Sequence, residues 1–467
     1  MTNRSFDPLT AIGPLDGRYR AVGELLSPYA SEWALMRYRV RVEVAWFLYL
    51  NRHANLPSFP HLSETVTAQC EDIWKDFSIS DGHAIREIES QTNHDVKAVE
   101  LFLRDKFTTL ELSDHLEWIH FACTSEDINN LAYALIVQDL LDEVLIPRFE
   151  GLIDDLLALA EPVVDLPMLA HTHGQTASPT TLGKELVVFA SRVHDIGKRL
   201  RGTVVRGKMN GAVGNFNAHT VAVPNLDWLA LGESFVKSLG LTPNPITTQI
   251  ESRDYFAQFL NDLQVFNGIL LDFVRDIWSY IAIGYFRQKK VSKEVGSSTM
   301  PHKVNPIDFE NAEGNLGIAN SLQEHLAHKL LISRWQRDLS DSTVLRNLGV
   351  AIGHTLLSIN STCKGISKLE PDEDKITTDL ESSWEVLTEA VQTVMRTQGI
   401  SNSYEVVKQT TRGKQMDEKL YQQLLSESGL SAENRTKLAS LRPDTYIGLA
   451  RELASREIDR IRNERLD

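Results

Sequence analysis

The stretch from residue 252 to 286 constrains the fold more than any other part of the chain. Its apolar side chains recur at a spacing of seven in parallel rows: Phe256, Leu263, Leu270 and Ile277 in one, and Phe259, Phe266, Phe273 and Tyr280 in another. This pattern predicts one long helix with a wide apolar face, which other helices must cover. Such helices can come from the same chain or from further subunits.

Long helical patterns also cover residues 181–207, 307–332 and 342–363. A further one starts at Thr124 or Ser125, either of which is a good N-cap, and could bend at Pro147. Five helices of this length predict a long antiparallel bundle and an all-α fold.

The domain organisation follows from these patterns. We expect an N-terminal helical domain over 1–113, a central long-helix domain over 114–366 and a small helical domain over 367–467. The chain shows no alternation of strands and helices, no GxGxxG after a strand and no P-loop. The sequence therefore gives little support to a dinucleotide-binding protein or a nucleoside triphosphatase.

The composition disfavours several classes of function. The 467 residues carry a formal net charge of −15 and include three widely spaced cysteines. Nucleic-acid binders usually present a basic face, and disulfide frameworks or zinc sites need paired cysteines. The N-terminus lacks the apolar core of a signal peptide, and no apolar stretch reaches the roughly 18 residues that cross a bilayer. We expect a cytoplasmic protein with neither a nucleic-acid nor a membrane partner.

Residues 296–306, GSSTMPHKVNP, interrupt the helical pattern. Pro301 and Pro306 cannot continue a helix, so the segment is predicted to be a loop longer than most connections between packed helices. Its three consecutive hydroxyls and its lysine suit a lid that closes over an anionic ligand. Taken alone, such a loop is equally well explained as a solvated connector.

Two histidines lie in a second break, LAHTHGQ at residues 169–175. No paired cysteine or HExxH motif accompanies His171 and His173, so a metal site is disfavoured. Histidine titrates near neutrality and could act as a general acid or base. On this motif alone, a hydrogen-bonded structural histidine is an equal alternative.

Three arginines occur close together near a predicted helix start: Arg334, Arg337 and Arg346. Arginine beside a helix N-terminus is a ready site for an anion. A solvated face with ordinary ion pairs is the alternative.

Together these groups meet the needs of an elimination from a carboxylate-bearing substrate. The reaction requires a base for a weakly acidic C–H, cations and donors for the charge that develops on the carboxylate, and an acid for the leaving group. Ser297, Lys303 with Asn305, and His173 could supply them. Serine is a poor base unless its oxyanion is stabilised, which a loop closing over bound substrate could achieve.

The loop GSSTMPHKVNP resembles the signature GSSxMPxKxNP of the fumarase/aspartase superfamily. Other blocks narrow the resemblance to the adenylosuccinate lyase family of the long bacterial type: DGRY at 16–19, TNHDVKAVE at 92–100, HFACTSEDINN at 120–130, THGQ at 172–175, NGAVGN at 210–215, TTQIE at 247–251 and SRWQRDLSDSTVLRN at 333–347. These blocks occur in order over essentially the whole chain.

The resemblance implies an all-α homotetramer with a twenty-helix core, in which loops of three subunits build each active site. It also implies β-elimination of fumarate from the small-molecule substrates adenylosuccinate, giving AMP, and SAICAR, giving AICAR, in purine nucleotide biosynthesis. No cofactor and no metal are implied.

Residue roles follow from the matching motifs. The resemblance implies Ser297 as the general base and His173 as the general acid. The fumarate carboxylates and the aci-carboxylate intermediate would be held by Ser298, Lys303, Asn305, Thr124, Ser125 and Gln249. The nucleotide end would be held by Arg18, Tyr19, Asn93, His94, Asp95, Asn311, Arg337, Ser342 and Arg346.

The histidine block departs from the family pattern, which has Arg before Thr172 and Pro after Gln175. His171 could therefore compete for the acid role, although THGQ keeps His173 in register. Another fumarate-releasing lyase (argininosuccinate lyase, fumarase or aspartase) is the main alternative, and the SRWQRDLSDSTVLR and TSEDINN blocks favour the purine substrate. A non-catalytic scaffold would not need Ser297, His173 and Lys303 together.

Overall fold

The computed structural model describes residues 6–289, 300, 303–411 and 416–466. The chain forms two compact units, each discontinuous in sequence. Unit 1 comprises Met1–Arg148, Ile196–Gly268 and Gly314–Ser358, and unit 2 comprises Phe149–Asp195, Ile269–Glu313 and Ile359–Asp467. The predicted all-α class is confirmed, because helices dominate the described elements and the strands are short. The division into three domains stays a prediction.

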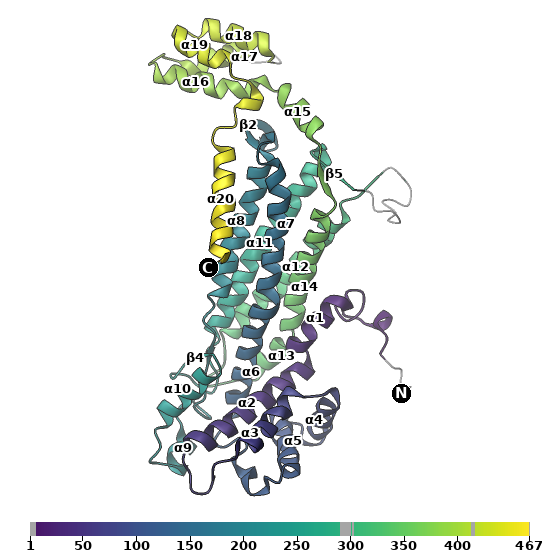
Figure 1. Cartoon of the computed structure of the whole chain (residues 1–467), viewed down its shortest axis with the longest axis vertical. Helices are drawn as coiled ribbons and strands as arrows, with labels where there is room; N and C mark the ends of the chain where they lie inside the picture. The colour runs from purple at the N-terminus through teal and green to yellow at the C-terminus, as the bar shows by residue number, and fades with distance from the viewer. Residues whose placement is uncertain (1–5, 290–299, 301–302, 412–415, 467) are drawn as a thin grey trace. The chain divides into compact units, whose positions relative to one another are not determined.

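Five long helices contribute residues to both units. They are α7 (Ile146–Ala160), α8 (Leu182–Arg201), α11 (Asp254–Ile283), α12 (Ile307–Leu330) and α14 (Leu348–Ile366). Within each unit, the segments of α8, α11, α12 and α14 lie side by side (Figure 1). These helices correspond to the predicted long patterns.

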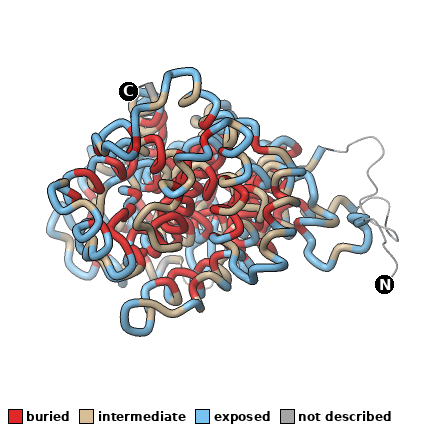
Figure 2. Tube along the Cα trace, turned by 90° about the horizontal axis from the view of Figure 1, so that it is seen from below, coloured by how far each residue is buried: buried red, intermediate tan, exposed pale blue. Residues whose placement is uncertain are grey.

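Helix α11 is the long apolar helix that the heptad-spaced rows predict. It spans 30 residues, and seven of the eight residues in the two rows are at most 1% exposed: Phe256, Phe259, Leu263, Phe266, Leu270, Phe273 and Ile277. Figure 2 shows the buried residues in red, interspersed along the tube with intermediate and exposed ones. Covering so many aromatic and aliphatic side chains supplies a large share of the hydrophobic stabilisation, at ~25 cal/mol per Å² of apolar surface.

A buried polar contact sets how three of these helices align in unit 1. The side chain of Asn267 is fully buried, and its Nδ2 donates to Asn320 Oδ1 at 2.9 Å and to Gln323 Oε1 at 3.0 Å. Thr355 Oγ1 donates to Asn267 Oδ1 at 3.1 Å. Because buried amides need partners, this network favours one register of α11, α12 and α14 over its neighbours.

Unit 1 also contains further helices and strands. They are α1 (Arg20–Ala30), α2 (Glu32–His53), α3 (Glu64–Lys75), α4 (Ile79–Thr92), α5 (Asp95–Thr109), α6 (Ser125–Leu140), β3 (Arg206–Gly207), α9 (Asn217–Ala222), α10 (Trp228–Ser238), β4 (Thr242–Pro243) and α13 (Ser340–Leu345). β3 and β4 pair in parallel.

The helix that starts at Ser125 changes its winding before Pro147. Thr124 is its N-cap, as predicted, and a π-helical turn over Leu141–Leu145 joins α6 to α7. Proline lacks an N–H and its ring clashes with the carbonyl four residues earlier. The wider π turn accommodates that clash without ending the helix.

The remaining elements of unit 2 include a hairpin and the C-terminal helices. They are β1 (Pro167–Thr172), β2 (Gln175–Thr181), β5 (Phe286–Gln288), β6 (Leu369–Pro371), α15 (Glu373–Glu381), α16 (Thr388–Thr397), α17 (Ser403–Thr411), α18 (Glu418–Glu427), α19 (Ala432–Ala439) and α20 (Ala450–Leu466). β1 pairs with β2, and β5 with β6, both antiparallel. One apolar cluster joins Leu169 of β1 to side chains of the C-terminal helices, among them Leu387, Val391 and Leu424.

Two predicted helix ranges differ in kind from the observed helices. The pattern over 181–207 ends as helix at Arg201, because the following residues lead into β3. The pattern over 342–363 is interrupted after Leu345, and α14 begins at Leu348. Among the described residues, no helix is long and apolar enough to span a bilayer.

Candidate active site

The first turn of α6 is tied to the glycine-rich turn over residues 208–215. The backbone N–H of Thr124 donates to Asp127 Oδ2 at 2.8 Å. The other carboxylate oxygen of Asp127 accepts from the backbone N–H groups of Asn210 and Gly211, at 3.0 and 3.2 Å. Lys208 Nζ lies 3.0 Å from the same oxygen, and both side chains of this ion pair are fully buried. The N-terminus of α6, with Thr124 and Ser125, is therefore held rigidly.

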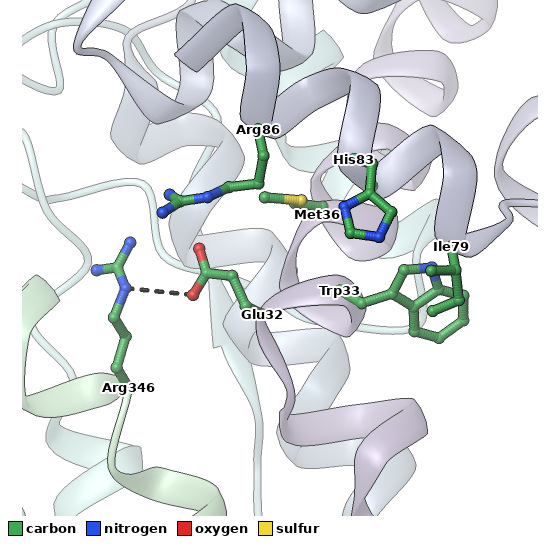
Figure 3. A pocket seen from close by; sticks show the side chains of 8 residues that line it. Glu32, Trp33, Met36, Ile79, His83, Arg86 and Arg346 are labelled. Atoms are coloured by element: carbon green, nitrogen blue, oxygen red, sulfur yellow. Dashed lines mark hydrogen bonds and ion pairs between the residues drawn. The ribbon is translucent and has the colours of Figure 1, made fainter. Parts of the chain in front are cut away.

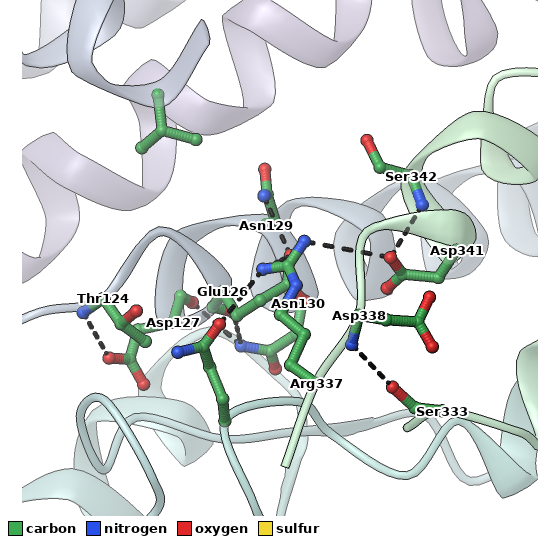
Figure 4. A network of polar contacts seen from close by, with 12 residues as sticks. Thr124, Glu126, Asp127, Asn129, Asn130, Ser333, Arg337, Asp338, Asp341 and Ser342 are labelled. Atoms are coloured by element: carbon green, nitrogen blue, oxygen red, sulfur yellow. Dashed lines mark hydrogen bonds and ion pairs between the residues drawn. The ribbon is translucent and has the colours of Figure 1, made fainter. Parts of the chain in front are cut away.

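A second set of charges lies one residue away, around Glu126. Arg337 Nη1 contacts Glu126 Oε1 at 3.0 Å, and Arg337 Nη2 lies 3.8 Å from Asp341 Oδ1. Figure 4 shows the Arg337 guanidinium between these two carboxylates. Arg337 Nη1 also reaches Gln249 Oε1 at 3.5 Å, and Gln249 Nε2 donates to the carbonyl of Ala212 at 3.0 Å. The structure thus brings the predicted residues Arg337 and Gln249 together beside the start of α6.

Arg346 forms a third group with Ser342 and Asp95. Arg346 Nη1 donates to Ser342 Oγ at 2.9 Å, and Arg346 Nη2 lies 3.5 Å from Asp95 Oδ2. Arg346 Nε contacts Glu32 Oε2 at 3.3 Å. Three residues predicted for the nucleotide end therefore meet, although they come from positions 95, 342 and 346.

Asp95 is held as a carboxylate. Burial alone would raise its pKa, but the guanidinium of Arg39, at 2.7 Å, outweighs this and the pKa lies below the usual range. The backbone N–H of Val96 and the charge of Arg346 act in the same direction. An anion approaching Arg346 would therefore compete with a fully charged Asp95.

A cavity of about 550 Å³ opens beside Arg346 (Figure 3). Its lining residues are Glu32, Trp33, Met36, Ile79, Gly82, His83, Arg86 and Arg346. The indole of Trp33 is fixed because its Nε1 donates to the carbonyl of Ser78 at 3.0 Å. The cavity combines an apolar wall with two guanidinium groups.

The Asn-His-Asp segment joins α4 to α5. Asn93 ends α4 in the left-handed region, at φ 52°, which asparagine tolerates better than most residues. His94 is the N-cap of α5, and its Nδ1 accepts from the backbone N–H of Lys97 at 3.1 Å. Both side chains are exposed. Arg18 and Tyr19 lie next to α1, with the Arg18 guanidinium 5.9 Å from the centre of the Tyr19 ring.

The histidine block of unit 2 forms a β-hairpin, which the sequence patterns did not predict. Thr172 pairs with Gln175, so His173 and Gly174 make a two-residue turn in which both φ angles are positive, at 54° and 72°. Such turns match the twist of the paired strands. His173 is exposed at the tip, whereas the His171 ring lies on the strand, 5.8 Å from the ring of Tyr285. The turn presents His173, and not His171, at its outermost point.

The remaining predicted residues of unit 2 lie at the start of α12 or before it. Lys303 is exposed and Asn305 is half-buried, and Gln288 Nε2 donates to the carbonyl of Val304 between them at 3.1 Å. Asn311 lies in the first turns of α12 and accepts from Ser361 Oγ at 2.8 Å. Ser297 and Ser298 lie outside the described residues.

Sequence reasoning missed the carboxylates and the arginine that hold these groups. Glu126, Arg253 and Asp341 are all buried, and no motif assigned them a role. Asp341 and Glu126 lie 88 and 127 residues from Arg253 in the sequence, so no local spacing could reveal these contacts. Glu126 and Asp127 form an acidic first turn of α6, which is visible in the sequence, but their tertiary partners are not.

Two family models match successive parts of the chain. Residues 26–319 match a family model described as "Lyase", and residues 333–447 match one described as "Adenylosuccinate lyase C-terminal". The chain is 49% identical to an adenylosuccinate lyase of Haemophilus influenzae, over 96% of this chain and 98% of that protein. It is 49% identical to one of Escherichia coli K12, over 95% and 97%. The chain belongs to the adenylosuccinate lyase family.

Solved structures share the fold at lower identity. A 3-carboxy-cis,cis-muconate lactonizing enzyme from Pseudomonas putida aligns with a TM-score of 0.73 at 21% identity, over 95% of this chain and 97% of that chain. A fumarate lyase from Mesorhizobium sp. BNC1 aligns with a TM-score of 0.72 at 19% identity, over 94% and 97%. At these identities the likeness establishes the fold alone.

Proposed function

We propose that this enzyme eliminates fumarate from adenylosuccinate, giving AMP, and from SAICAR, giving AICAR. The observation that carries the proposal is the identity of 49% with adenylosuccinate lyases over nearly the full length of both chains. The arginines of unit 1 agree with a phosphorylated substrate, because guanidinium groups are suited to phosphate recognition. We place the reaction in the cytoplasm.

The reaction breaks one C–H and one C–N bond of the succinyl group. Ser297, as an alkoxide, takes the proton from the carbon β to the nitrogen, and the electron pair enters the adjacent carboxylate to form the aci-carboxylate. As that pair returns to form the C=C bond of fumarate, the C–N bond breaks and His173 protonates the departing nitrogen. Atoms and charge balance without a cofactor.

Positive charge and N–H dipoles stabilise the intermediate. Lys303 and Asn305, with Ser298, would hold the carboxylate on which charge develops, and Gln249 would hold the second carboxylate. Thr124 and Ser125 lie at the N-terminus of α6, where the helix dipole favours an anion. The buried Asp127–Lys208 ion pair supports this helix end, because Asp127 also accepts the backbone N–H of Thr124.

The active sites are proposed to form between subunits of a homotetramer. Large apolar side chains are exposed on the long helices, among them Val188 on α8, Val265 and Trp278 on α11, Ile318 on α12 and Val350 on α14. Exposed apolar side chains on several bundle helices support self-association. The exposed position of His173 also agrees with a residue that serves a neighbouring subunit.

One assay separates this function from its alternatives. Purified protein is given adenylosuccinate, SAICAR, argininosuccinate, malate or aspartate, and fumarate is measured in each case. We expect turnover of the first two substrates. Turnover only of argininosuccinate, malate or aspartate would instead assign the chain to another fumarate-releasing lyase. The Ser297→Ala variant should bind adenylosuccinate without turning it over, and full activity of that variant would remove Ser297 from the base role.

A further inference from the structure

Arg253 is a buried cation that none of the sequence motifs assigns. It lies immediately before α11 and is 3% exposed. Its backbone is in the left-handed region, at φ 62°, where a long side chain is unfavourable. Strain of this kind persists only where surrounding contacts enforce it, and it concentrates at functional sites.

The contacts that enforce this conformation are ionic. Arg253 Nη2 donates to Glu126 Oε2 at 3.1 Å and to Asp341 Oδ2 at 2.9 Å. The backbone N–H of Arg253 donates to Glu251 Oε2 at 2.7 Å. Burial would lower the pKa of the Arg253 guanidinium, but Glu126 and Asp341 raise it above the usual value, so the group stays charged.

Arg253 and Arg337 share the same two carboxylates. Arg253 contacts one oxygen of Glu126 and one of Asp341, and Arg337 faces the other oxygen of each. Two guanidinium groups and two carboxylates therefore balance in charge. The Arg337 side chain is 14% exposed whereas that of Arg253 is 4% exposed, so Arg337 is the member that can turn toward a ligand.

A substrate anion that binds Arg337 must draw it away from Glu126 and Asp341. Without Arg253, that movement would leave two buried carboxylates without a counter-ion, which is strongly unfavourable. With Arg253 in place, each carboxylate keeps one guanidinium contact. We propose that Arg253 is a positioning residue that keeps Glu126 and Asp341 paired and so makes Arg337 available to the phosphate end of the substrate. The inference rests on the proposed function, because it takes the phosphorylated substrate from there.

The test compares adenylosuccinate with its dephosphorylated analogue, succinyladenosine, in Arg253→Met and Arg253→Lys. In Arg253→Met, Arg337 alone neutralises both carboxylates and is held by them. We expect KM for adenylosuccinate to rise about tenfold or more, the size of one charged hydrogen bond, with little change in kcat. KM for succinyladenosine should stay near its wild-type value, and Arg253→Lys should recover part of the loss because it restores the charge.

A matched control is Arg104→Met, which removes another arginine–carboxylate pair of unit 1, with Glu117, away from this network. It should leave both KM values unchanged. An equal loss with both substrates in Arg253→Met would show a purely structural role, and an unchanged KM for adenylosuccinate would equally overturn the proposal. If Arg253→Met fails to fold, the same comparison of KM for adenylosuccinate with KM for succinyladenosine is made with Arg253→Lys. Failure of the proposed function is separate, because it would appear as absent turnover in the wild-type enzyme.

Discussion

The start of α6 and the tip of the β1–β2 hairpin are built in opposite ways. At α6, Asp127 and Glu126 are buried and bound by cations and backbone N–H groups of the same unit. At the hairpin, His171 and His173 are exposed. One region is complete within its own unit, and the other presents its chemical groups outward.

We propose that this difference reflects two roles, substrate binding at α6 and proton donation at the hairpin. Groups that hold a substrate gain from rigid, buried support, since binding to a preorganised site costs little reorganisation. A proton donor must instead reach the substrate, and an exposed turn can do so in an assembly.

Replacing the exposed histidine should abolish most of the turnover. We expect His173→Ala to lower kcat by about 10²- to 10⁴-fold, the usual contribution of a general acid, while binding of adenylosuccinate and the thermal midpoint change little. Initial rates of fumarate release and equilibrium binding measure the two effects. The control is His171→Ala, which should keep most of the activity. The reverse ranking would assign the acid role to His171.

Breaking the buried Asp127–Lys208 ion pair should lower the stability of the fold. Asp127→Ala leaves Lys208 buried without its carboxylate, and we expect the free energy of unfolding to fall by roughly 3–5 kcal/mol. Urea titration followed by circular dichroism measures this change. Glu117→Gln removes a carboxylate whose side chain is 87% exposed, and should leave the unfolding curve where it is. Equal curves for Asp127→Ala and wild type would refute the supporting role of the pair.

The glycine-rich turn beside α6 should tolerate no side chain. Gly214 has φ 81°, and a Cβ there would lie 2.3 Å from the carbonyl oxygen of Thr247. Gly214→Ala should therefore destabilise the protein by about 2 kcal/mol or more. The matched control is Gly151→Ala, where a Cβ meets nothing within 4 Å. Thermal unfolding of both variants should separate them clearly, and similar midpoints would mean that the turn adapts.

The smallest effect concerns pH. Because Arg39 and Arg346 hold the pKa of Asp95 below its value in the unfolded chain, about 3.9, the ionised carboxylate stabilises the fold. This stabilisation is fully present above the unfolded value and is lost as the pH falls through the folded one. Asp95→Asn should therefore be less stable than wild type at neutral pH, and the difference should shrink below pH ~4. A difference independent of pH would exclude this linkage.

Long, periodic features were predictable from the sequence, and long-range polar contacts were not. The rows of α11 and the Thr124 cap follow from local rules of helix formation. The hairpin around His173 was missed because its strands are short and carry mixed side chains, so neither shows a clear alternation. The sharing of Glu126 and Asp341 by Arg253 and Arg337 depends on tertiary contacts that no local spacing encodes.

Mixing two inactive variants tests most directly whether one active site takes residues from different subunits. His173→Ala and Ser297→Ala subunits are purified separately, mixed under conditions that allow subunit exchange, and assayed for fumarate release from adenylosuccinate. If different subunits supply the two residues to one site, activity should return to about a quarter of wild type for equal, random mixing. Activity that stays at the level of the separate variants, despite demonstrated exchange, would contradict the shared site.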